Sequence, residues 1–152
     1  SNVDSQQNIE KITSMLNIMS EKIHIVFPIH PRTKKSINNC TIALSDNIRL
    51  LDPLPYVEFL SLMSNAKLVV TDSGGIQEET TYLGVQCITV RENTERPITV
   101  ELGTNHLTGT VANNILRVFN DIVEGRCKRG EIPSKWDGNS GKRIANVIND
   151  FL

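Results

Sequence analysis

Two adjacent glycines, Gly74 and Gly75, follow Ser73 in the stretch TDSGGIQEET (71–80), directly after the apolar residues 68–70. A turn of this kind between a strand and a helix leaves free backbone N–H groups at the positive end of the helix dipole. Glycine lets a phosphate approach the backbone without a Cβ in between, and the serine hydroxyl adds a donor. The stretch therefore predicts an anion site suited to a phosphate group.

Glu79 stands four positions after Gly75, so its carboxylate is expected about one helical turn further along the same side. A carboxylate beside a phosphate site can accept hydrogen bonds from the vicinal hydroxyls of a ribose. The alternative is that Ser73 only caps the helix, while Glu78 and Glu79 only complement its dipole. These residues alone leave the two interpretations equally open. The stretch has neither the P-loop lysine nor the GxGxxG spacing, so it predicts neither of those sites.

The elements that position this turn follow from apolar periodicity and turn residues. Strands are predicted at 23–27, 47–51, 67–71, 86–90 and 106–108, and helices at 9–19, 55–64, 75–83, 113–123 and 141–152. Segment 36–44 has no clear pattern. Alternation of strands and helices indicates an α/β fold: a Rossmann-like parallel sheet with helices on both faces.

Two further expectations concern the surroundings of the glycines. The polar segment 91–97 follows a predicted strand, and ligand-binding loops of such sheets lie outside the carboxyl ends of strands. On the helix that ends at Gly84, the residues Ile76, Thr80 and Leu83 share a stripe that is expected to face the sheet.

Composition narrows the classes of protein and partner. The 152 residues fit one domain, and a net charge of −1 argues against nucleic acid or an anionic membrane as a partner. Apolar runs are far shorter than the ~20 residues of a membrane span. Cys40, Cys87 and Cys127 form no CxxC pair, so the sequence predicts no metal site and favours a reducing cytoplasm.

The stretch DSGGIQEE (72–79), together with the later RENTERP (91–97), resembles the non-hydrolysing UDP-N-acetylglucosamine 2-epimerase family. That family carries DSGG(I/V)QEE followed by RD(N/T)TERPE. Other segments match in the same order: FPIHPRT (27–33), LLDPLPYVEFL (50–60), LGV (83–85), ELGTNHLTG (101–109) and IPSKWDG (132–138). Two positions depart from the family pattern, because Glu92 replaces the usual aspartate and Ile98 the usual glutamate.

The resemblance implies a GT-B architecture, in which two Rossmann-like domains enclose the active site. Residues 1–152 look like the C-terminal, UDP-binding domain, and the N-terminal domain with the proton-transfer groups is missing. The implied full-length enzyme is a cytoplasmic homodimer of polysaccharide biosynthesis that interconverts UDP-GlcNAc and UDP-ManNAc. It removes the C2 proton, eliminates UDP and adds it back, without a cofactor. This chain alone is expected to be inactive and to hold no catalytic residue.

The resemblance also implies roles in binding the diphosphate and the ribose. Ser73, Gly74 and Gly75 would hold the diphosphate, and Glu79 would accept the ribose hydroxyls. Arg96 would approach the uridine end of the ligand. The alternative for Arg96 is a surface ion pair with Glu92 or Glu95.

Three more residues receive roles in the same way. Leu54 and Phe59 would form the apolar wall for uracil; the alternative for Phe59 is plain core packing. His30 would lie near a second, regulatory UDP-sugar, or could be a satisfied loop residue. Three rival functions remain open: a GT-B glycosyltransferase donor domain, a hydrolysing 2-epimerase and a non-catalytic nucleotide-sugar sensor.

Overall fold

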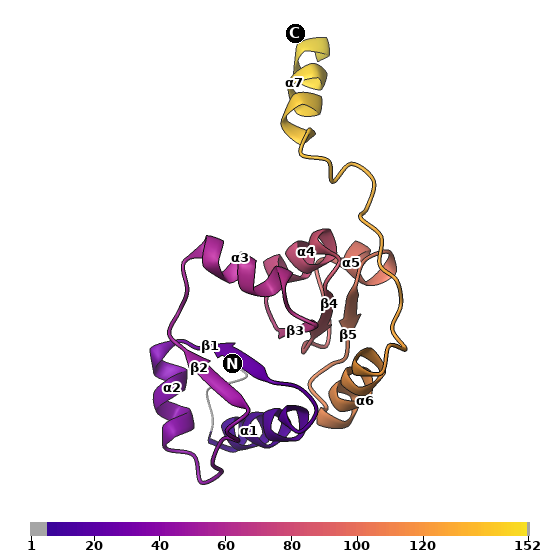
Figure 1. Cartoon of the computed structure of the whole chain (residues 1–152). Helices are drawn as coiled ribbons and strands as arrows, with labels where there is room; N and C mark the ends of the chain where they lie inside the picture. The colour runs from indigo at the N-terminus through magenta and orange to yellow at the C-terminus, as the bar shows by residue number, and fades with distance from the viewer. Residues whose placement is uncertain (1–5, 152) are drawn as a thin grey trace.

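The computed structural model of the chain describes residues 6–151 (Figure 1). In chain order the elements are α1 Gln6–Ser20, β1 Ile25–Pro28, α2 Pro31–Asn38, β2 Ile48–Leu51, α3 Tyr56–Ser64, β3 Leu68–Thr71, α4 Gly74–Leu83, β4 Gln86–Thr89, α5 Pro97–Glu101, β5 Asn105–Leu107, α6 Ala112–Val123 and α7 Ser140–Phe151. The predicted bounds agree within three residues. Two short helices, α2 and α5, were not predicted. The ends of the predicted domain, residues 1–5 and 152, lie outside the described residues.

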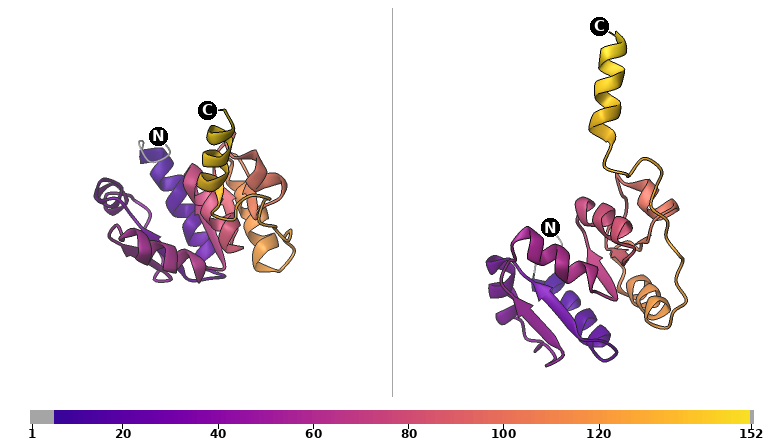
Figure 2. Two further views of the ribbon diagram at one scale, coloured as in Figure 1. Left: turned by 90° about the horizontal axis from the view of Figure 1, so that it is seen from above. Right: turned by 45° about the horizontal axis from the view of Figure 1, so that its top comes forward.

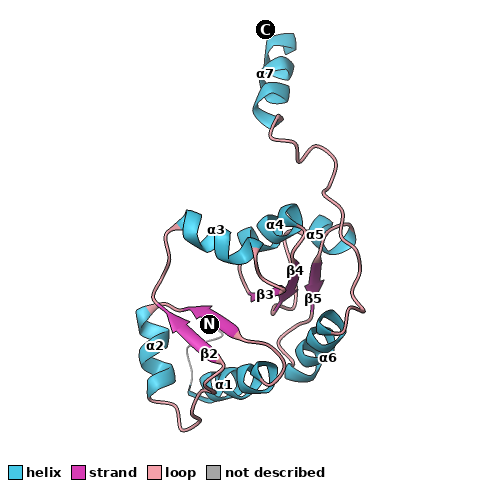
Figure 3. Ribbon diagram, viewed as in Figure 1, coloured by secondary structure: helices cyan, strands magenta, loops and turns pink. Residues whose placement is uncertain are grey.

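All strand pairs in the described residues are parallel, as the alternation of elements predicts (Figure 3). β1 pairs with β2, and β3, β4 and β5 form a three-stranded sheet with β4 in the middle. Within residues 6–151 no hydrogen-bonded ladder joins the two sheets. The register pairs Thr71 with Thr89, so the loops after β3 and β4 leave the same edge of the sheet.

Helices cover both faces of the three-stranded sheet, and the pleat of β4 shows why. Ile88 is fully buried in an apolar core with residues of α1 and α6, including Phe119. Cys87 points to the opposite face, where the Thr80 hydroxyl of α4 contacts its thiol. Successive side chains of a strand point to opposite faces, so a strand buried on both sides needs a helix on each. The predicted fold class is confirmed.

The face of α4 that meets the sheet differs from the prediction. Its buried residues are Gln77, Thr80 and Thr81, whereas Ile76 and Leu83 are only half-buried. The buried stripe is therefore polar and rotated by about one residue. Gln77 is paired there with Asn105 of β5, and the Thr80 hydroxyl donates to the Ile76 carbonyl of its own helix, whereas the Thr81 hydroxyl has no hydrogen-bond partner in the described residues. The helix ends at Gly84 in the left-handed conformation (φ 71°), as predicted.

The last helix, α7, stands away from the rest of the molecule at the end of the long loop after α6 (Figure 2). None of its residues is buried. Ile144, Val147, Ile148 and Phe151 recur at helical spacing and form an exposed apolar stripe, with Phe151 86% exposed. In the described part of the chain no helix has the length and apolar character to cross a bilayer.

Candidate functional site

The turn between β3 and α4 has the backbone geometry that the glycines predict. Ser73 occupies the N-cap position of α4 in an extended conformation (φ −84°, ψ 132°) and is exposed. Its backbone N–H donates to Thr71 Oγ1 at 3.0 Å. Its side chain makes no capping hydrogen bond to the helix. The capping alternative therefore does not account for this serine, and its hydroxyl remains available to a ligand.

The two glycines have different surroundings. At Gly75 an added Cβ would meet nothing within 4 Å, so the backbone there faces open space. At Gly74 an added Cβ would lie 2.5 Å from Glu95 Oε1. A hydrogen bond from its own backbone N–H, followed by one from the Arg91 guanidinium, holds the pKa of Glu95 below its usual value. A carboxylate therefore stands beside the first residue of α4.

The acids of α4 lie beyond its first turn, where they complement the dipole weakly. Arg96 Nε lies 3.0 Å from Glu78 Oε1, an ion-pair distance, although it lacks the alignment of a hydrogen bond. Arg96 therefore pairs with Glu78 and not with the expected Glu92 or Glu95, although its charge still contributes to the lowered pKa of Glu95. Glu79 is half-buried, and within residues 6–151 its carboxylate has no hydrogen bond or ion pair. It is the acid that stays available for a ligand.

Glu92 has a different task, because it joins the loops after β4 and β5. Its Oε1 accepts hydrogen bonds from the backbone N–H and the hydroxyl of Thr110, both at 2.9 Å. These two bonds, the backbone one first, lower the pKa of Glu92. The loop that carries Arg96 is thus anchored to the loop after β5 as well as to α4.

The remaining predicted site residues lie between the end of β1 and α3 along the chain. Leu54, in the loop after β2, and Phe59, on α3, are half-buried and belong to neither apolar core cluster. α3, the helix of Phe59, packs against α4, the helix that follows the glycine turn. His30 is exposed and caps α2, because its Nδ1 accepts from the Arg32 backbone N–H at 3.3 Å. The ligand roles of all three remain predictions.

A buried polar network behind the turn was missed by the sequence reasoning. Gln77 Oε1 accepts hydrogen bonds from Thr94 Oγ1 (2.6 Å) and from Asn105 Nδ2 (3.0 Å). Gln77 and Asn105 are both fully buried. The available signal was the helical spacing of Gln77, Thr80 and Thr81, three polar residues with hydrogen-bonding side chains on one face of a helix that must pack on a sheet.

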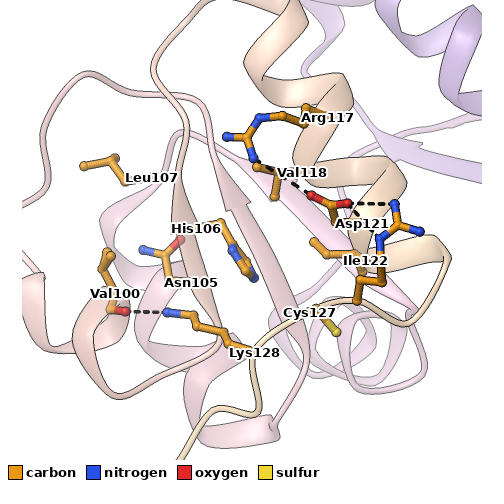
Figure 4. Close-up of a pocket in the computed structure, with 11 residues that line it drawn as sticks. Val100, Asn105, His106, Leu107, Arg117, Val118, Asp121, Ile122, Cys127 and Lys128 are labelled. Carbon is orange, nitrogen blue, oxygen red and sulfur yellow. Dashed lines mark hydrogen bonds and ion pairs between the residues drawn. The ribbon is translucent and has the colours of Figure 1, made fainter.

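A separate cavity of about 370 Å³ lies between β5, α6 and the chain after α6 (Figure 4). Arg126 and Arg117 lie 2.9 and 3.9 Å from Asp121, and Lys128 donates to a backbone carbonyl. Burial, and then the charge of Lys128, lowers the pKa of His106. The predicted site residues do not line this cavity. Its charged groups already have partners, and we assign it no ligand.

Comparisons with known proteins show which family the chain belongs to. A sequence model of the UDP-N-acetylglucosamine 2-epimerase family matches residues 1–149. The UDP-N-acetylglucosamine 2-epimerase of Methanococcus maripaludis is 41% identical over 97% of this chain, and that of Methanocaldococcus jannaschii 39% over 97%. The chain spans about 41% of the length of each of these relatives.

Solved structures show the same fold. A crystal structure of the Methanocaldococcus jannaschii UDP-GlcNAc 2-epimerase in complex with UDP-GlcNAc and UDP matches with a TM-score of 0.82 and 37% identity. The match covers 98% of this chain and 42% of that one. The Neisseria meningitidis enzyme bound to UDP-GlcNAc matches with a TM-score of 0.79 and 30% identity, over 98% and 42% of the two chains. The chain therefore belongs to the UDP-N-acetylglucosamine 2-epimerase family.

Proposed function

We propose that this chain is the C-terminal, UDP-binding domain of a non-hydrolysing UDP-GlcNAc 2-epimerase with GT-B architecture. Family membership and the solved relatives with UDP-GlcNAc or UDP support this assignment. The single observation that carries it is the turn between β3 and α4. It presents an uncommitted Ser73 hydroxyl and open backbone at Gly75 at the start of the helix, and an unpartnered Glu79 follows on the same helix.

Each group has a task in holding UDP. The backbone N–H groups of Gly74 and Gly75 and the Ser73 hydroxyl would donate to the diphosphate, whose charge the helix dipole favours. Glu79 would accept hydrogen bonds from the ribose hydroxyls one turn further on. Arg96, whose Nε lies within 3.0 Å of Glu78 on the same helix, would donate toward the uridine end.

The proposed reaction requires UDP to leave the sugar and yet stay bound to the enzyme. A base takes the C2 proton of the sugar while the bond from C1 to the UDP oxygen breaks, which leaves a glycal and UDP. Reprotonation of C2 on the other face and re-addition of UDP at C1 complete the inversion. The sugar undergoes no net oxidation or reduction, so the scheme needs no redox cofactor. A firm grip on UDP serves this reaction because it raises the chance of re-addition over escape.

The proton-transfer groups would belong to the part of the protein outside this chain. The exposed apolar stripe of α7, at Ile144, Val147, Ile148 and Phe151, supports the proposal that this part packs against the chain. The 152 residues alone would therefore bind UDP without turning over UDP-GlcNAc. A homodimer, a cytoplasmic location and a place in polysaccharide biosynthesis are parts of the same proposal.

Calorimetric titration of the chain with UDP, UMP and UDP-GlcNAc tests the proposal. We expect UDP to bind more tightly than UMP, because the turn grips both phosphates. Equal affinity for UDP and UMP would contradict the diphosphate site. For the full-length protein, UDP-ManNAc should form from UDP-GlcNAc without an acceptor sugar. Formation of free UDP and free sugar instead would indicate a hydrolysing enzyme.

A further inference from the structure

Gln77 is the centre of a buried hydrogen-bond network that links one helix, two strands and a loop. Its Oε1 accepts from Thr94 Oγ1 and Asn105 Nδ2, and its Nε2 donates to Ser73 O at 3.3 Å. Asn105 Oδ1 accepts in turn from Thr89 Oγ1 at 2.6 Å. The network therefore joins the start of α4, the loop after β4, and strands β4 and β5.

The loop end of this network holds Arg96 from both sides. The Arg96 backbone N–H donates to Thr94 Oγ1 at 3.0 Å, the same oxygen that donates to Gln77. The Arg96 carbonyl accepts from Thr99 Oγ1 at 2.7 Å and from the Thr99 N–H at 3.0 Å. Thr99 Oγ1 also accepts from Asn105 Nδ2 at 3.0 Å, which closes the ring of bonds.

We propose that Thr94, Gln77, Asn105 and Thr99 form a clamp that positions Arg96 beside α4 for binding a uridine diphosphate. This inference rests on the proposed function. It assigns the four residues as positioning residues, because none of them needs to touch the ligand. Their side chains act through the Arg96 backbone and through the carbonyl of Ser73.

Burial makes the clamp rigid. Gln77, Thr99 and Asn105 are completely buried, so each donor or acceptor left unpaired would carry a desolvation penalty. The network satisfies these groups in one arrangement only, with the Gln77 oxygen toward Thr94 and its nitrogen toward Ser73. A loop held in this way loses little conformational freedom when the ligand arrives, which favours binding.

The network could position Arg96 or could only stabilise the fold. Variants of Thr94 distinguish these two roles. Thr94→Val removes the hydroxyl at nearly constant shape, while Thr94→Ser keeps it. Thr94 is only half-buried, so both variants are expected to fold. Thr13→Val is the matched control, because Thr13 is fully buried in α1 and its hydroxyl has no hydrogen-bond partner in the described residues.

Calorimetry with UDP measures the effect in the 152-residue chain. We expect Thr94→Val to weaken UDP binding roughly fivefold to tenfold, whereas Thr94→Ser and Thr13→Val bind like the wild type. In the Arg96→Ala background, Thr94→Val should change the affinity less than twofold, because the residue it positions is gone. Equal losses in the two backgrounds, or no loss in the wild-type background, would overturn the inference and leave the proposed function standing.

Amide hydrogen exchange tests the clamp without a ligand. The Arg96 amide should be protected in the wild type and in Thr94→Ser, and should exchange faster in Thr94→Val. Protection unchanged by Thr94→Val, or a fast Arg96 amide in the wild type, would overturn the clamp itself. A wild-type chain that shows the protection but does not bind UDP would contradict the proposed function, and with it the ligand-binding half of this inference.

Discussion

Glu95 places its carboxylate against Gly74, so that a Cβ at position 74 would lie 2.5 Å from Glu95 Oε1. The positive end of the α4 dipole favours a negative charge at this place. The carboxylate therefore lies where a phosphate would approach the helix. A bound diphosphate would meet it as a neighbouring negative charge, and Glu95 would have to turn away.

This contact predicts that Glu95→Gln tightens UDP binding. Removal of one negative charge beside the diphosphate should raise the affinity roughly twofold to fivefold at low salt, with a smaller gain in high salt. Calorimetry with UDP at two salt concentrations measures the change. Glu101→Gln, at an exposed position on α5, is the control and should have little effect. Weaker UDP binding in Glu95→Gln would show instead that the carboxylate supports the site.

Ser73→Ala should weaken the binding of UDP and UDP-GlcNAc without lowering the stability of the chain. The hydroxyl makes no capping hydrogen bond, so its removal costs the folded state little. A hydrogen bond to a charged diphosphate is worth roughly 1.5–3 kcal/mol. Thermal unfolding and calorimetry on the same samples separate the two effects. A lower Tm with unchanged UDP affinity would make Ser73 a structural residue.

Glu79→Gln should lower the affinity for uridine nucleotides by roughly 1–3 kcal/mol, because the ribose hydroxyls lose a charged acceptor. The ligand 2′-deoxy-UDP provides the sharper comparison. It should bind the wild type more weakly than UDP does, and it should lose less than UDP does when Glu79 is changed. An equal loss for UDP and 2′-deoxy-UDP would place the carboxylate away from the 2′-hydroxyl.

Asp137 gives a pH-dependent contribution at the start of α7. Hydrogen bonds from the Asn139 backbone N–H, and then from Arg143, lower its pKa from 3.8 to about 2. The folded pKa is depressed, so the stabilisation is fully present above about pH 4 and is lost as the pH falls toward 2. An NMR titration of the Asn139 amide should therefore show a midpoint near 2, absent in Asp137→Asn. A midpoint near 3.8 would contradict the interaction.

The sequence was sufficient to predict the turn and the elements around it. The apolar run before Thr71, the glycine pair and Gly84 at the end of the helix are local signals, and local signals determine where strands and helices begin and end. Helix α2 was missed although His30 and Pro31 are start signals. It is rich in charge and buries one residue, Ile37, so apolar periodicity could not reveal it.

Partners across the fold could not be predicted in the same way. Arg96 pairs with Glu78 because the tertiary structure brings the loop after β4 to α4, and Glu92 binds Thr110 because the loops after β4 and β5 lie together. The network around Gln77 joins residues up to 28 positions apart. The identity of a hydrogen-bond partner at such a distance depends on sheet register and helix rotation, which residue patterns do not specify.

The most direct test of the central claim is an NMR titration that follows the backbone amides of Ser73, Gly74 and Gly75. With UDP we predict large shifts of the Gly74 and Gly75 amides, because their N–H groups donate to the diphosphate, and only small shifts with uridine. The claim is contradicted if UDP binds while these amides remain unchanged and the shifts gather elsewhere in the chain.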